Sequence, residues 1–263
     1  MKKLKMNALL ALVEQGSSRF NEMIKDYTSF FKGEQGQFRG QKKTYDARPD
    51  FSDKPEERGE TIIVTTVNEK YDWLIEQATS YISQAMGIEA TNSFGAKKVS
   101  LIVDGKDFGE LSANELMRLR NLINQLDGTF KITPVRDDKR IWNPTTNSEY
   151  SGRDVWETPL QESVERTTIK TQQILPDPNV EKLRDTSKYN PVVSDINTIQ
   201  EIGDKTLQYF SGEWSHRQRA ELMRRKSAFL DAIAVALKEV NDIDSQDTDL
   251  KVSEFMQYLI YGK

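Results

Sequence analysis

The longest regular pattern of hydrophobic and polar positions runs from Trp214 to about Asn241. Its apolar residues recur at steps of three and four, the spacing of one buried face on an α-helix. Ser215 followed by Gln218 matches a capping box, in which two side chains satisfy N–H groups at a helix start. The pattern predicts a long C-terminal helix with an apolar face formed by Leu222, Met223, Phe229, Leu230, Ile233, Ala234, Leu237 and Val240.

Residues 1–32 predict a helical N-terminal arm built from two helices. Apolar residues at helical spacing mark one helix over Lys3–Glu14 and another that ends near Phe31. Gly16-Ser17-Ser18 lies between them, and either serine suits the N-cap of the second helix. Because each helix carries an apolar stripe, we expect the arm to dock on its own chain or on a second copy.

Residues 33–60 lose this periodicity. Glycine and proline recur through the segment, and its only large apolar residues are Phe38, Tyr45 and Phe51. Long irregular segments are usually functional, wrapped around another subunit or disordered. We therefore predict an extended polar loop and leave these three alternatives open.

The middle of the chain combines strand and helix signals. Thr61–Val67 is β-branched and predicts a strand, and the apolar spacing after Asn68 predicts a helix that stops at Gly87. Lys97–Val103 is a second expected strand, and Asp104-Gly105 is a hairpin signal that turns the chain back.

A second capping box, Ser112 with Glu115, opens another expected helix, which has a stripe of leucine and isoleucine and a stop at Gly128. The segments that follow suit an antiparallel region with turns between strands. The expected strands there are Phe130–Val135, Arg140–Trp142, Ser163–Leu175 and Pro191–Leu207. After the long helix we expect an acidic linker over Asp242–Asp249 and a short helix over Val252–Tyr261.

These elements predict an α+β fold, in which an antiparallel sheet packs with several amphipathic helices. The helical N-terminal arm comes first and the polar loop of residues 33–60 second. Residues 61–263 then form a single globular body that includes the long C-terminal helix.

Composition narrows the class of protein. The chain has 263 residues, no cysteine and a formal net charge of −4, so disulfides and thiolate chemistry are excluded. The apolar run near the N-terminus is short and lacks a cleavage site, which argues against a signal peptide. No stretch reaches the roughly 18–20 apolar residues of a membrane span. We expect a cytoplasmic protein that contacts no membrane, and the acidic charge argues against nucleic acid as a partner.

The search for a catalytic or metal site finds no complete pattern. His216 is the only histidine, and an exposed residue at a helix start explains it better than catalysis does. The acidic run Asp242–Asp249 departs from a calcium-binding loop at the sixth and twelfth positions. Asp104, Asp107 and Glu110 cluster near the hairpin, where turn chemistry explains Asp104. We predict no catalytic residue, no metal and no cofactor.

Basic and aromatic residues supply the candidate ligand-binding site. Arginine forks match phosphate oxygens, helix N-termini favour anions, and tryptophan rings stack on bases. The alternative is that these charges only keep exposed segments solvated and pair with nearby glutamates. The candidate residues are Lys42, Lys43, Tyr45, Arg48, Trp142, Trp156, Arg217, Arg219 and Arg224, and Lys32 and Arg39 belong to the same basic segment as the first four.

Several short motifs carry a resemblance that extends over most of the chain. They are Lys3-Leu4-Lys5-Met6-Asn7, Lys43-Thr44-Tyr45, Pro55-Glu56-Glu57-Arg58, Val103-Asp104-Gly105, Tyr209-Phe210-Ser211-Gly212, Arg219-Ala220-Glu221-Leu222 and Phe255-x-x-Tyr258-Leu259. In this order they resemble an uncharacterised family of phage and actinobacterial proteins, known only as a domain of unknown function. The resemblance implies a phage or mobile-element setting and a free-standing accessory protein, and it transfers no catalytic residue.

We compare three functions. The preferred one is a non-enzymatic, phage-type accessory protein that binds and sequesters a ligand or host factor as a homo-oligomer. In its sharper form the ligand is a nucleotide immune signal, which would make the protein an anti-defence factor directed at a host defence system. The alternatives are a nucleic-acid-binding accessory protein and a metal-dependent nucleotide hydrolase.

Overall fold

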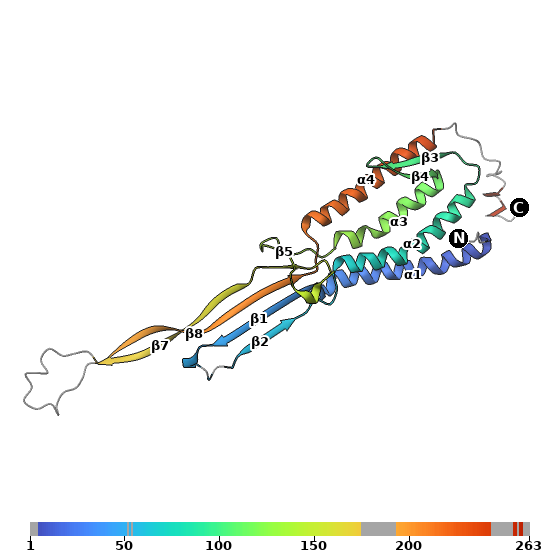
Figure 1. The fold of residues 1–263 in the computed structure, drawn as a ribbon. Coiled ribbons are helices and arrows are strands. Elements are labelled where there is room, and N and C mark those ends of the chain that lie inside the picture. Colours follow the sequence, from blue (N-terminus) through green and yellow to red (C-terminus); the bar gives the residue numbers. More distant parts are fainter. Residues whose placement is uncertain are drawn as a thin grey trace, which may run out of the picture. The chain divides into compact units, whose positions relative to one another are not determined.

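The structure is a computed structural model that describes residues 5–51, 53, 55–174, 193–242, 255–256 and 258–259. Four long helices and two antiparallel sheets make up the described residues (Figure 1). The protein is therefore an α+β protein with a long C-terminal helix, as predicted. No helix in the described ranges is long and apolar enough to cross a membrane.

The described residues fall into two compact units. The first, here called the helical unit, lies within Met1–Thr28, Ile75–Lys131 and Ala220–Lys263. The second, here called the sheet unit, comprises Ser29–Leu74 and Ile132–Arg219. Each unit has its own buried apolar residues.

One uninterrupted helix, α1 (Met6–Gly33), replaces the two helices expected in the N-terminal arm. The interpretation of Gly16 as a break was wrong, because this glycine permits close packing inside the helical unit. A Cβ at Gly16 would lie 2.9 Å from the ring of Tyr81 in α2 (Val67–Asn92). The ring of Phe20, one turn further along α1, packs on the same tyrosine with centroids 4.8 Å apart.

Two other glycines expected as helix stops also lie inside helices. Gly87 is within α2, and Gly128 is within α3 (Ala113–Lys131). A glycine in a helix costs only about 1 kcal/mol relative to alanine, so buried neighbours can hold the helix through it. Ile88 is such a neighbour, since it belongs to the core of the helical unit.

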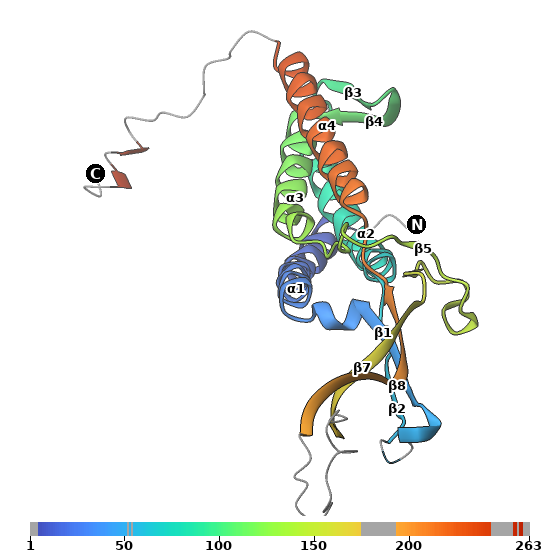
Figure 2. The same ribbon diagram turned by 90° about the vertical axis from the view of Figure 1, so that its left-hand side faces the viewer.

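The predicted hairpin of the helical unit is confirmed as β3 (Lys98–Val103) and β4 (Lys106–Ser112). Its turn residues Asp104 and Gly105 have φ of 50° and 79°, as a two-residue hairpin turn requires. Alternate residues of β3 are buried against α3 and α4 (His216–Val240), and Figures 1 and 2 show the hairpin beside α4.

Both predicted capping boxes are confirmed. The Ser112 amide donates to the Glu115 carboxylate at 2.9 Å, and the Ser215 amide donates to Gln218 Oε1 at 2.7 Å. A third box, which the sequence reading missed, opens α2: the Thr66 amide donates to Glu69 at 2.9 Å. The expected cap at Asn68 was therefore wrong by two residues.

The segment predicted as an extended polar loop contains two strands of the main sheet, so that prediction was wrong. β1 (Arg39–Ala47) pairs with β2 (Glu57–Thr61) on one side and with β8 (Val193–Ser211) on the other. Residues 60 and 61, where the loop was to end and the body to begin, both lie in β2. Phe38, just before β1, is fully buried and anchors the strand.

The sheet order is β2-β1-β8-β6-β5, and β7 (Gln161–Ile174) pairs with the rest of β8. β5 (Asn143–Pro144) and β6 (Trp156–Glu157) are two residues long. Strands expected over Phe130–Val135 and Arg140–Trp142 do not form, because α3 continues to Lys131 and the chain then runs as a loop. Of the expected strand Thr61–Val67, only Thr61 is in a strand.

Beyond the end of β1, β7 and β8 continue as a two-stranded ribbon (Figures 1 and 2). A bulge separates the two parts, because Glu165 pairs with Gly203 and Arg166 pairs with Glu201. The expected turn and loop within residues 175–192, the acidic linker after Asp242 and most of the final helix lie outside the described residues. Phe255, Met256, Tyr258 and Leu259 are helical, as predicted.

Candidate ligand-binding site

One face of the β1–β8 pair carries the candidate site. Side chains alternate between the two faces of a strand, and residues directly opposite each other share a face. Gln41 lies opposite Tyr209, and Arg39 lies opposite Ser211. A single surface at the Arg39 end of β1 therefore contains Arg39, Gln41, Tyr209 and Ser211.

A cavity of about 410 Å³ lies over this surface. Its floor is the β1–β8 surface with Thr61 of β2, and its wall is the loop that contains Asp137, Arg140 and Trp142. The volume is within the range of small-molecule sites. The full lining is Gly36, Arg39, Gly40, Gln41, Thr61, Asp137, Arg140, Trp142, Tyr209, Phe210, Ser211 and Glu213.

The wall is held in place by bonds around Asp137. Its side chain accepts a hydrogen bond from the Lys139 amide at 3.0 Å, and its carbonyl accepts one from the Arg140 amide at 3.3 Å. The same carbonyl accepts the indole N–H of Trp142 at 2.8 Å. These local bonds direct both Arg140 and Trp142 at the cavity without any regular secondary structure.

Arg140 lies over the Tyr209 ring on the floor of the cavity. Its guanidinium carbon is 3.6 Å from the centroid of the Tyr209 ring, a close cation–π contact. Its one ion pair within the described ranges is loose, since Nε is 4.0 Å from the Asp137 carboxylate. The rim of the guanidinium, which carries the N–H donors, therefore remains available to a ligand.

Arg39 lines the cavity, and a buried carboxylate holds it there. Its Nε donates to Glu213 Oε1 at 2.8 Å, and Glu213 is 3% exposed while Arg39 is 54% exposed. Burial raises the pKa of Glu213, and the nearby positive charge of Arg39 opposes that rise. Ser211 also donates to Glu213 at 3.1 Å. The carboxylate thus holds Nε of Arg39, while Nη2 of the same guanidinium donates to Gln35 Oε1 at 3.4 Å.

A second arginine–aromatic pair lies next to the cavity and is structural. Arg136 is buried, and its guanidinium carbon is 4.0 Å from the centroid of the Trp156 ring. Burial lowers the pKa of Arg136. Trp156 was predicted to bind ligand. Its ring is in contact with Arg136, and it lines a different cavity of about 440 Å³, formed by residues 144–156.

The four predicted residues on and after β1 separate by strand face. Lys43 and Tyr45 lie on the face of the cavity and line a second hollow of about 270 Å³, whereas Lys42 pairs with Glu60 at 3.9 Å. Tyr45 is 7% exposed and packs on Gly203, where a Cβ would collide with the tyrosine ring. Arg48 is held by ion pairs to β8, at 2.7 Å to Glu201 and 3.3 Å to Asp204.

The predicted residues of α4 lie in different surroundings. Arg217 is exposed, and Arg219 donates to the Thr133 carbonyl at 3.4 Å and lines another cavity. Arg224 belongs to the helical unit and pairs with Asp104 at 3.1 Å and Glu221 at 2.8 Å. The cavity of about 410 Å³ beside Arg140 and Tyr209 is called the main cavity from here on. Of the nine predicted residues, only Trp142 lines it.

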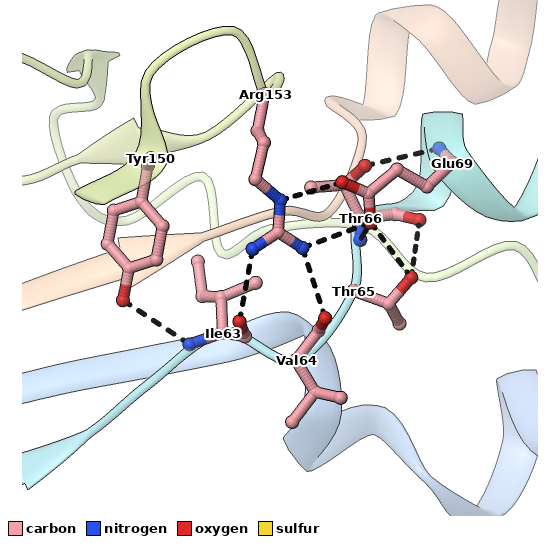
Figure 3. Close-up of polar contacts among 7 residues, drawn as sticks. All are labelled: Ile63, Val64, Thr65, Thr66, Glu69, Tyr150 and Arg153. Atoms are coloured by element: carbon pink, nitrogen blue, oxygen red, sulfur yellow. Dashed lines mark hydrogen bonds and ion pairs between the residues drawn. The ribbon is translucent and has the colours of Figure 1, made fainter. Parts of the chain in front are cut away.

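Arg153 shows how an arginine is used when it is purely structural (Figure 3). It donates to both carboxylate oxygens of Glu69, at 2.6 and 3.0 Å. It also donates to the carbonyls of Ile63 at 3.3 Å and Val64 at 3.1 Å. Tyr150, from the same loop as Arg153, accepts the Ile63 amide at 3.3 Å. This network, which also includes Thr65 and Thr66, ties the loop to the start of α2.

Sequence reasoning missed Arg140 and Tyr209 and named Arg39 only as part of a basic segment. Tyr209 is in the motif Tyr209-Phe210-Ser211-Gly212, and its alternation with Leu207 and Ser211 was the available signal. Arg140 is two residues before Trp142, so the strand predicted for this segment places both side chains on one face. That prediction does not show that Tyr209 lies beneath them. Within the described ranges, no group of three or more His, Asp or Glu side chains is arranged to hold a metal ion.

The chain belongs to a family of unknown function, DUF7873, whose model matches residues 3–261. This confirms the resemblance to an uncharacterised family, while its phage and actinobacterial distribution stays a prediction. No curated protein and no solved structure matches the chain.

Proposed function

We propose that this protein is a non-enzymatic binding protein whose main cavity takes a small ligand with a flat ring and an anionic group, as in a nucleotide. The observation that carries the proposal is the stacking of Arg140 on Tyr209. Stacking orients the guanidinium while leaving its N–H rim free to donate to a phosphate. Trp142 lines the same cavity and offers a ring for stacking on a base.

The charges of the cavity favour a ligand of low charge. Its two arginines, Arg39 and Arg140, are formally balanced by Asp137 and Glu213. A neutral cavity does not concentrate highly charged anions, so binding depends on directed hydrogen bonds. We therefore expect nucleoside monophosphates to bind at least as tightly as triphosphates.

Calorimetric titration with a matched panel tests this proposal. The panel contains a nucleoside, its mono-, di- and triphosphate, and ribose 5-phosphate, which lacks the base. We expect the monophosphate to bind clearly more tightly than the nucleoside and the sugar phosphate, because only it engages both the rings and the arginines. The absence of heat from every member of the panel would contradict the proposal.

The biological role that we propose rests on the resemblance to phage proteins. A phage setting and a nucleotide immune signal as the ligand would make the protein a sequestering anti-defence factor, and both stay predictions. Sequestration requires that the ligand leaves chemically unchanged. Mass spectrometry of a bound nucleotide after prolonged incubation should therefore recover the intact molecule, and recovery of a cleaved product would favour the hydrolase alternative.

A separate observation supports a homo-oligomer. β7 pairs with β8 alone, so its outer edge of 14 residues has no strand partner among the described residues. Long open edges pair with other strands. We propose that the partner is β7 of a second copy, paired antiparallel about a twofold axis.

The charges along β7 favour one register for such a pair. A twofold axis places residues from the same face opposite each other, so the pair must be centred on a residue. Centring on Glu165 or Arg166 would place a charge opposite its own copy. Centring on Val164 places Glu162 opposite Arg166 of the partner subunit at two symmetric positions.

Single cysteines test this register, because the chain contains none of its own. Val164→Cys should form a disulfide-linked dimer under mild oxidation, since opposed residues lie within disulfide reach. Thr168→Cys is the matched control, because its copies would be roughly 27 Å apart at about 3.4 Å per residue. A monomer by light scattering, or equal crosslinking of both variants, would contradict the pairing.

A further inference from the structure

A second cavity in the sheet unit, of about 280 Å³, is lined by three separate segments. Lys32 is in the last turn of α1, Gln35 follows that helix, and Arg219 is in the first turns of α4. The third segment is the chain from Ile132 to Val135. The cavity shares no lining residue with the main cavity.

Backbone bonds fix two of these segments, the chain from Ile132 to Val135 and the start of α4, against each other. The Trp214 amide donates to the Pro134 carbonyl at 3.2 Å, and the Arg136 amide donates to the Trp214 carbonyl at 2.8 Å. The capping box at Ser215 then starts α4, so Arg219 follows one turn later. Hydrogen-bonded backbone around Pro134 and Trp214 therefore forms one wall of the cavity.

Hydrogen bonds orient the polar groups of the cavity. Arg219 Nη1 donates to the Thr133 carbonyl at 3.4 Å, which fixes one corner of the guanidinium. Gln35 Nε2 donates to the Phe31 carbonyl at 3.4 Å, and Phe31 itself is fully buried in the wall. Arg219 is half-buried and Lys32 is exposed, so the arginine lies deeper than the lysine.

The electrostatics of this cavity differ from those of the main one. Among the described residues, its lining contains two cations, Lys32 and Arg219, and no carboxylate. In the part of the chain that the structure describes, neither cation forms an ion pair with an acidic side chain. Arg39 and Arg140 of the main cavity each have one. Two cations that converge on a cavity without a counter-charge attract an anion.

We infer that this second cavity binds a tetrahedral oxyanion of the phosphate class. Arg219 supplies a fork that matches two phosphate oxygens, and Lys32 supplies a point charge at the entrance. The inference is independent of the proposed nucleotide site, because the two cavities have separate linings. One hydrogen bond of 3.4 Å, from Arg39 to Gln35 Oε1, connects residues of the two linings.

Nuclear magnetic resonance titration with inorganic phosphate and pyrophosphate tests the inference at constant ionic strength. The amides of Gln35 and Thr133 should shift saturably, and pyrophosphate should bind more tightly than phosphate. Arg219→Gln and Lys32→Gln should each weaken binding at least about fivefold, because each removes one of two cations. Arg219→Lys keeps the charge but loses the fork, so it should retain intermediate affinity.

Arg217→Gln is the matched control, since Arg217 is on the same turn of α4, is exposed and lines neither cavity. It should leave phosphate binding unchanged. Equal weakening by Arg217→Gln and Arg219→Gln would overturn the site in favour of diffuse attraction to the helix end. Absence of saturable shifts in the wild-type protein would also overturn it. Arg140→Gln should leave the phosphate shifts intact, which separates this site from the nucleotide site.

Discussion

Arg153 and Arg140 belong to the same stretch of the sheet unit, yet the structure uses them in opposite ways. Arg153 directs hydrogen bonds at the Glu69 carboxylate and at the carbonyls of Ile63 and Val64. Arg140 lies on the Tyr209 ring, and its one ion pair among the described residues is a contact of 4.0 Å to Asp137. The residue type is identical, so the number of committed donors distinguishes an arginine that holds the fold from one that can hold a ligand.

The partner of Arg153, Glu69, has a structural role of its own, whereas the Tyr209 ring beneath Arg140 forms the floor of the cavity. Hydrogen bonding from Arg153 is the largest influence on Glu69 and lowers its pKa, despite partial burial that acts in the opposite direction. Glu69 also caps α2 through Thr66. Loss of Arg153 would therefore disturb a helix start and a loop together, whereas loss of Arg140 would expose one face of a tyrosine ring.

The largest expected effect is on stability in Arg153→Gln. A hydrogen bond to a charged group contributes about 1.5–3 kcal/mol, and Arg153 is 26% exposed, so we expect a loss of about 2 kcal/mol. For a chain of this size that corresponds to a fall of roughly 4–8 °C in Tm. Calorimetric thermal unfolding measures it. An unchanged Tm would show that the network in Figure 3 does not hold the fold.

The next largest effect should be a loss of stability at acidic pH, caused by protonation of Glu69 in the Arg153–Glu69 pair. The pKa of Glu69 is lowered in the folded state from the ordinary value of 4.5. Its stabilising contribution is thus complete above that value and is lost as the pH falls through the lower, folded pKa. The difference in Tm between the wild type and Arg153→Gln should therefore shrink on acidification. A constant difference from neutral to strongly acidic pH would contradict this linkage.

A smaller effect is expected from Glu213→Gln, on binding rather than stability. Burial raises the pKa of Glu213, so it takes up a proton at a higher pH than an exposed glutamate does. Protonation leaves the charge of Arg39 uncompensated, and affinity for an anionic ligand should rise as the pH falls. Glu213→Gln should bind a few-fold more tightly at neutral pH and lose this dependence. Titration across pH measures it, and an unchanged pH profile would exclude Glu213 as its source.

The sequence predicted those parts of the fold that depend on local chemistry. The capping boxes at Ser112 and Ser215 and the Asp104-Gly105 turn need only neighbouring residues, and all are present. Gly16 was misinterpreted because its role is contact with Tyr81, which is distant in sequence. The strand β1 was missed because both its neighbours, β2 and β8, must be known before its polar residues form a recognisable pattern.

The candidate site was predicted less well for the same reason. Trp142 was identified by residue type, but its neighbours Arg140 and Tyr209 meet only after β8 places Tyr209 beneath the loop. Arg48 and Arg224 were attractive as basic residues, and the structure shows each with acidic partners. The sequence shows which residues are charged, but only the structure shows which of these charges are paired with an opposite charge.

The most direct test of the central claim is nucleoside monophosphate affinity measured on three variants in parallel. Arg140→Gln should weaken binding at least about tenfold while its Tm stays close to that of the wild type. Lys139→Gln, an exposed neighbour with the same change in charge, should bind normally, and Arg153→Gln should bind normally once corrected for its folded fraction. Equal weakening by Arg140→Gln and Lys139→Gln, or normal binding by Arg140→Gln, would contradict the assignment of Arg140 to the ligand.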